Sequence, residues 1–132
     1  MNAGLLTVNF LLVILFLGLT LFSGKRGNRE LHYGMAANTV LFLVFAILQA
    51  EIFGRDYEFN PVRLNVHLCF AFTALISLPG VVWSGLRLRK NGAMRSVHKR
   101  WVAGFVILTL GAILTAGWMF LDSTPILSSV TT

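Results

Sequence analysis

Four long apolar stretches follow one another along the chain, separated by short polar segments. They cover about residues 5–22, 32–53, 64–86 and 97–121, and residues 122–132 form a polar tail. Each stretch is close to the ~20 residues that a helix needs to cross the hydrocarbon core of a bilayer. In lipid, only helices satisfy their own backbone hydrogen bonds over that length. Short connections also make successive helices antiparallel neighbours. The pattern therefore predicts one domain, residues 1–132, with an all-α fold: an integral membrane four-helix antiparallel bundle.

The composition supports this interpretation. Hydrophobic residues make up 56% of the 132 positions and charged residues only 12%, about half the usual share of a soluble domain. A soluble protein this short has too little interior for so much apolar surface, so most of that surface faces a lipid bilayer. The formal net charge of +6 would suit a nucleic-acid ligand if it were spread over a polar surface. Because it is confined to two segments, we expect no nucleic acid as a partner.

The basic residues predict the orientation of the chain. Nine of the eleven Lys and Arg residues lie in or just after segments 23–31 and 87–96, and only Arg55 and Arg63 lie at the other ends of the spans. Cytoplasmic loops of membrane proteins carry an excess of Lys and Arg. We therefore expect segments 23–31 and 87–96 to be cytoplasmic loops and both termini to lie outside.

A histidine follows each basic segment. His32 begins the second span and His98 the fourth, at the same depth of one leaflet. If these spans are adjacent or diagonal, the two imidazoles can converge on one metal ion, one haem iron or one anionic group. Met35, one turn from His32, can add a thioether ligand suited to Cu(I) or haem. The alternative is that both histidines bind lipid headgroups beside the basic segments.

A third histidine, His67, lies about one turn inside the third span, at its other end. The connection over residues 54–61 is short enough to bring Gln49 or Glu51, near the end of the second span, close to this histidine. A histidine with a polar or acidic partner can hold a metal ion, relay protons or contact a quinone head group. It can equally form a structural hydrogen bond between two helices.

Small residues mark places where helices can approach closely. Gly104 and Gly111 are seven residues apart and share a face of the fourth span. We expect them to pack against another helix of the same bundle, with a partner subunit as the alternative. Pro79-Gly80 predicts a kink in the third span, because proline lacks the N–H group that a helix uses.

Several of these residues form a pattern known from a family of membrane proteins. The pattern consists of Asn2 and Gly18, the run from Arg29 to Ala37, the run from Phe42 to Phe45, His67, the run from Arg95 to Trp101, and Thr115-Ala116-Gly117. It resembles the CtaM/YozB-type family of four-span membrane proteins, a domain family of unknown function that is associated with the maturation of haem–copper oxidases. The resemblance covers about residues 2–121.

This resemblance implies a non-enzymatic assembly or maturation factor for a respiratory haem–copper oxidase, located in a prokaryotic cell (inner) membrane and in contact with oxidase subunits. It implies that His32, Met35, His67 and His98 handle metal or haem, and it leaves open whether the cofactor is haem or copper. Members of the family tend to carry a Tyr and then a His near the outer end of the second span. This chain has Gln49 and Glu51 there, so an outer site departs from the family pattern.

No catalytic motif is recognisable in the sequence. It has no glycine-rich phosphate loop, His-Glu-x-x-His, Cys-x-x-Cys or nucleophile elbow, so we expect no enzyme. Two alternatives to the assembly factor stay open. One is a small b-type cytochrome or quinone-interacting electron carrier with His32 and His98 as axial ligands. The other is a structural accessory subunit of a larger membrane complex.

Overall fold

Four helices make up most of the computed structural model, which describes residues 3–126. They are α1 (Ala3–Arg26), α2 (Arg29–Gly54), α3 (Pro61–Lys90) and α4 (Arg95–Phe120). Each is long and apolar enough to cross a membrane. The predicted all-α fold with four membrane-length helices is therefore confirmed, and the chain is a multi-pass membrane protein. Asn2 and residues 127–132 of the predicted tail lie outside the described residues.

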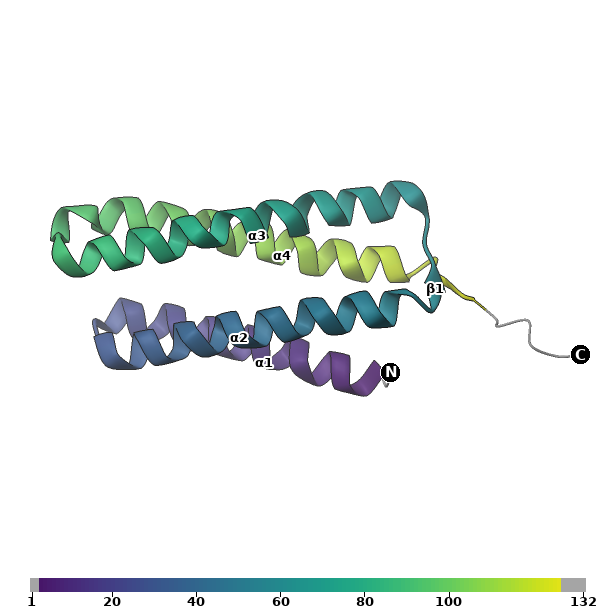
Figure 1. Ribbon diagram of the computed structural model, residues 1–132, viewed down its shortest axis with the longest axis horizontal. Helices are drawn as coiled ribbons and strands as arrows, with labels where there is room; N and C mark the ends of the chain where they lie inside the picture. Colours follow the sequence, from purple (N-terminus) through teal and green to yellow (C-terminus); the bar gives the residue numbers. More distant parts are fainter. Residues whose placement is uncertain (1–2, 127–132) are drawn as a thin grey trace, which may run out of the picture. The chain divides into compact units, whose positions relative to one another are not determined.

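The helices pair along the sequence into two helical hairpins (Figure 1). In the first hairpin α1 packs against α2, and in the second α3 packs against α4. Within each hairpin the two helices run antiparallel, as short connections require.

The helices extend beyond the predicted spans. Lys25 and Arg26 are the last residues of α1, and α3 continues to Lys90. Segments 23–31 and 87–96, predicted as loops, are therefore mostly helical, and this prediction was wrong. The first is interrupted only at positions 27–28, and the second only by Asn91 and the short 3-10 helix η1 (Gly92–Met94). Lys and Arg are good helix formers and are favourable near a helix C-terminus, so leaving the apolar stretch does not end the helix.

A glycine and an asparagine form the tight turn between α1 and α2. Gly27 has a φ of +75°, in the left-handed region that glycine adopts most easily. The N–H of Gly27 donates to the carbonyl of Gly24 at 3.3 Å, and the N–H of Asn28 donates to that of Ser23 at 3.2 Å. This is the hydrogen-bond pattern of a Schellman motif, which ends α1. The Asn28 side chain then accepts from the N–H of Leu31 and caps α2.

The interior of each hairpin is formed mainly by small and polar side chains. The buried residues are Leu6, Asn9, Val13, Ser23, Thr39 and Ala46 in the first hairpin, and Ala74, Ser84, Phe105, Thr109 and Met119 in the second. Large apolar side chains point outward; Ile76 is 75% and Leu114 74% exposed. This distribution is expected in lipid, where burying a leucine brings no hydrophobic gain and small residues let helices approach closely.

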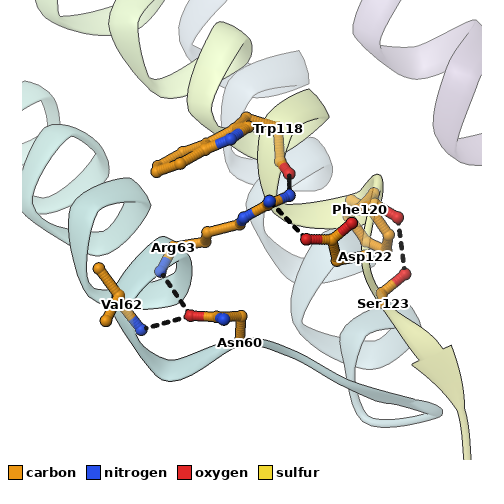
Figure 2. Close-up of polar contacts among 7 residues, drawn as sticks. All are labelled: Asn60, Val62, Arg63, Trp118, Phe120, Asp122 and Ser123. Atoms are coloured by element: carbon orange, nitrogen blue, oxygen red, sulfur yellow. Dashed lines mark hydrogen bonds and ion pairs between the residues drawn. The ribbon is translucent and has the colours of Figure 1, made fainter.

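Arg63 of α3 bonds to residues at the end of α4, at the end of the second hairpin opposite η1. Its Nη1 donates to the Trp118 carbonyl at 2.9 Å, and its guanidinium carbon lies 4.9 Å from the centre of the Trp118 ring. Its Nη2 forms an ion pair with Asp122, as Figure 2 shows. At the same end, Asn60 caps α3 by accepting from the N–H of Val62 at 3.0 Å.

Two short strands, β1 (Tyr57–Glu58) and β2 (Thr124–Pro125), pair in a two-stranded sheet that the apolar pattern did not predict. Strands of two residues leave no recognisable alternation in the sequence, and they do not change the all-α class.

Candidate histidine sites

The imidazole of His32 in α2 is held by α1. Its Nδ1 lies 2.9 Å from the carbonyl oxygen of Thr20. Because a carbonyl oxygen only accepts, Nδ1 must carry a proton, and the neutral ring has its lone pair on Nε2. A Cβ atom at Gly24 would lie 3.0 Å from both Nδ1 and Cε1 of this ring. Glycine at position 24 therefore allows the imidazole to lie this close to α1.

His98 in α4 has the same relation to α3. Its Nδ1 lies 3.0 Å from Oγ of Ser84, a side chain with no exposed surface. The same hydroxyl lies 3.0 Å from the Val81 carbonyl, so it can donate its proton there and accept from Nδ1 of His98. A Cβ atom at Gly85 would lie 3.1 Å from Cε1 of the ring. The second hairpin thus repeats the close contact between a glycine and an imidazole.

The two sites share a sequence pattern that our sequence analysis missed. Each hairpin carries Ser-Gly-x-Arg near the end of its first helix and Arg-x-x-His at the start of its second. The segments are Ser23–Arg26 with Arg29–His32, and Ser84–Arg87 with Arg95–His98. In the first hairpin the buried Ser23 hydroxyl donates to the Thr20 carbonyl, the same oxygen that accepts from His32. The recurrence of the two short patterns in both halves of the chain is the signal that could have identified these serines and glycines.

Met35 lies one turn beyond His32 in α2, and its side chain is half-buried. Its carbonyl accepts from the Thr39 hydroxyl at 2.8 Å, and that hydroxyl lies 3.0 Å from the hydroxyl of Thr20. Among residues 3–126, no group of three or more His, Cys, Asp and Glu side chains is placed to hold a metal ion. Each hairpin instead provides one imidazole, His32 or His98, just after its basic segment.

The polar residues at the opposite ends of the helices bond within their own hairpins. Nδ1 of His67 lies 3.0 Å from the Ala112 carbonyl and so carries a proton, and it lies 3.3 Å from Oγ1 of Thr115. These two partners are in α4. In the first hairpin, Gln49 accepts from the buried Asn9 amide of α1 at 2.9 Å. Glu51 pairs with Arg55 one turn along α2, and both side chains are largely exposed.

The two glycines expected to pack against a helix lie in different surroundings. A Cβ atom at Gly111 would lie 2.5 Å from Cδ1 of Phe70, so the ring of this α3 residue lies directly on the glycine. A Cβ atom at Gly104 would meet nothing within 4 Å, and Gly104 lines a groove. Pro79 lies inside α3, which continues on both sides of it, and Gly80 lies against the ring of Trp101, which a Cβ atom would approach to 2.5 Å.

Comparison with protein-family models, curated proteins and solved structures finds no match for this chain. The resemblance to the CtaM/YozB-type family therefore stays a prediction.

Proposed function

We propose that this protein is a non-enzymatic membrane assembly factor for a respiratory haem–copper oxidase, and that it handles haem or copper through His32 and His98. The observation that supports the proposal is the shared way in which the two imidazoles are held. In both, Nδ1 lies within 3.0 Å of an oxygen on the other helix of the hairpin, to which it can donate. Metal-ligating histidines almost always donate their other ring N–H in this way, because it fixes the tautomer and the ring orientation.

The ligand chemistry suits either cofactor. A neutral imidazole with its lone pair on Nε2 ligates haem iron and copper ions alike. Met35, one turn from His32, adds a thioether of the kind that binds Cu(I) or haem iron. His67 has the same Nδ1 arrangement at the other end of the second hairpin and is a further candidate ligand.

We further propose that the basic helix ends lie in the cytoplasm of a prokaryotic cell, with both termini outside. The distribution of nine Lys and Arg residues against two supports this orientation. In a Cys69→Ser background, a cysteine at Asn91 should react with an impermeant reagent only from the cytoplasm, and one at Asn60 only from outside. The reverse labelling would contradict the orientation.

Deletion of the gene, followed by complementation, tests the assembly role. We expect the deletion strain to contain the oxidase polypeptides but to have low oxidase activity and an altered haem or copper content. Complementation with His32→Asn or His98→Asn is the informative step. The asparagine amide can donate from about the position of Nδ1 but has no nitrogen at the position of Nε2. Both variants should therefore accumulate like the wild type and fail to restore the oxidase.

The matched control is Arg89→Lys, which keeps the positive charge of the helix end and should restore oxidase activity fully. Normal oxidase activity and metal content in the deletion strain would overturn the proposal. An absorbance spectrum of the protein purified in mild detergent then separates the remaining alternatives. A Soret band that shifts on reduction would indicate a b-type electron carrier, and a colourless protein would indicate an accessory subunit.

A further inference from the structure

A groove lies between α3 and α4 of the second hairpin, toward the helix ends that carry the basic residues. Its volume is about 500 Å³, in the range of small-molecule binding sites. Thr73, Ile76 and Ser77 of α3 line one side, and the α4 side includes Arg100, Trp101 and Gly104. The α4 lining extends from position 97 to position 108, which corresponds to about 16 Å along the helix axis. The groove is therefore long and runs parallel to the helices.

The groove is apolar except near one end. The hydroxyls of Thr73 and Ser77 donate to carbonyls of their own helix, at 2.6 and 2.7 Å, so their protons are already used. Gly104 contributes no side chain to the α4 wall, and the space above it is open. Among the lining residues, Arg100 alone carries a charge. The apolar length of the groove matches the acyl chain of a lipid, and the guanidinium near its end matches a charged headgroup.

The charges around Arg100 favour an anion. Within residues 3–126, the ion pairs are Arg55–Glu51 and Arg63–Asp122, and neither involves Arg100. In the second hairpin, the acidic residues Glu58 and Asp122 lie at the opposite end of the helices. Six basic residues lie at the end that carries the groove: Arg87, Arg89, Lys90, Arg95, Lys99 and Arg100. Within the second hairpin, no carboxylate therefore lies at the end that carries Arg100, and a guanidinium is a strong donor for a phosphate group.

We propose that this groove binds one anionic phospholipid, with an acyl chain lying between α3 and α4 and the phosphate on Arg100. Because the helices span the membrane, the groove is parallel to the acyl chains of the bilayer. Arginine near the end of a membrane helix also extends its charged group to the depth of the lipid headgroups. The inference needs neither histidine, so it can fail or succeed independently of the proposed assembly role.

Trp101 provides a direct measurement, because its ring lines the groove. In the full-length protein, Trp83→Phe and Trp118→Phe leave Trp101 as the single tryptophan of the chain. The protein is placed in phosphatidylcholine vesicles that contain a small fraction of either brominated phosphatidylglycerol or brominated phosphatidylcholine. We expect phosphatidylglycerol to be preferred at this site on the order of fivefold, as one guanidinium–headgroup contact supplies. Equal quenching by the two lipids would overturn the proposal.

Two matched pairs of variants locate the site. Arg100→Gln should abolish the preference for phosphatidylglycerol, whereas Lys99→Gln, the neighbouring cation outside the groove lining, should retain most of it. An equal loss in both variants would mean general attraction to a basic helix end and would overturn the site. Gly104→Leu should fill the groove and reduce quenching by brominated phosphatidylglycerol. Gly117→Leu, also in α4 with open space around its Cβ position, should not. Unchanged quenching in Gly104→Leu would overturn occupation of the groove.

Discussion

The two hairpins are built alike at one end and differently at the other. At the basic end, each places a Ser-Gly pair of its first helix beside a histidine of its second, with Nδ1 of the ring within 3.0 Å of an oxygen of that first helix. At the opposite end, the first hairpin joins its helices through the amides of Asn9 and Gln49. The second uses the imidazole of His67 on the Ala112 carbonyl and the guanidinium of Arg63 on the Trp118 carbonyl.

This difference separates two requirements. Many kinds of interhelical hydrogen bond can join two helices in lipid, so an amide pair and an imidazole serve equally well at the ends opposite the basic ones. At the basic ends, by contrast, the Ser-Gly pair, the histidine and the ring nitrogen that faces the first helix all recur, although the partner is a carbonyl for His32 and a hydroxyl for His98. Joining two helices does not require so close a repetition. We therefore assign the proposed ligand role first to His32 and His98.

The largest expected effect on stability is that of adding a methyl group at a glycine in each hairpin. Gly111→Ala would place a Cβ atom 2.5 Å from the ring of Phe70, whereas Gly18→Ala in the first hairpin would meet nothing within 4 Å. We expect Gly111→Ala to lower the free energy of unfolding by about 1–3 kcal/mol, the cost of overpacking. Gly18→Ala should be neutral or stabilising by up to about 1 kcal/mol, because alanine is the better helix former.

Unfolding of the purified protein in mixed micelles with increasing sodium dodecyl sulfate measures both variants. Equal stability of the two variants would show that Phe70 moves aside at little cost. Close helix packing would then not require glycine at position 111 any more than at position 18.

A smaller effect on stability is expected for Arg55 and Arg63, which lie at the ends opposite the basic ones. Arg63 is 22% exposed and bonds to both a carbonyl and a carboxylate, whereas the Arg55–Glu51 pair is 73% and 69% exposed. We expect Arg63→Gln to cost about 1 kcal/mol, because it removes a charged hydrogen bond and an ion pair together. Arg55→Gln should change stability by less than about 0.5 kcal/mol. The same unfolding measurement compares the two variants. A larger loss of stability in Arg55→Gln than in Arg63→Gln would contradict the role of Arg63 in joining α3 to the end of α4.

The number and position of the helices could be predicted because lipid leaves the chain few choices. A run of ~20 apolar residues must span the membrane as a helix. The helix ends could not be predicted from the same pattern, since Arg26 and Lys90 end helices that continue past the apolar runs. Those ends depend on Gly27, with its positive φ, and on the side-chain cap of Asn28.

The partners of the histidines were harder to predict than the histidines themselves. The position of His32 and His98 at matching helix ends follows from the sequence. The acceptor for His32 is the backbone carbonyl of Thr20, which any residue would supply. The pairing of Asn9 with Gln49 depends on how α1 is rotated about its axis. A helix that is apolar on all sides gives no indication of which face packs against its neighbour.

The smallest expected effect on stability is that of removing a serine hydroxyl at each basic end. The two serine variants test whether His32 and His98 depend on the same kind of hydrogen-bond partner. Ser84→Ala removes the hydroxyl that lies 3.0 Å from Nδ1 of His98. Ser23→Ala leaves the Thr20 carbonyl in place, so His32 keeps its acceptor. An interhelical hydrogen bond in lipid contributes only about 0.6 kcal/mol on average, so unfolding experiments hardly resolve this loss. The ¹⁵N spectrum of protein with labelled imidazoles does resolve it, because the protonated and unprotonated ring nitrogens have different chemical shifts.

In the wild type, we expect both rings to be protonated at Nδ1. In Ser84→Ala, the His98 ring should show a mixture of tautomers, and in Ser23→Ala the His32 ring should be unchanged. An unchanged His98 signal would mean that the Val81 carbonyl, which now accepts from Ser84, takes over the role that the Thr20 carbonyl has for His32. The two basic ends would then share a backbone acceptor, and the serine would be a secondary support.

If His98 binds haem or copper as proposed, loss of the fixed tautomer in Ser84→Ala should also weaken that binding on the order of tenfold. A titration of the purified Ser84→Ala protein with the same cofactor measures this loss, with Ser23→Ala as the matched control.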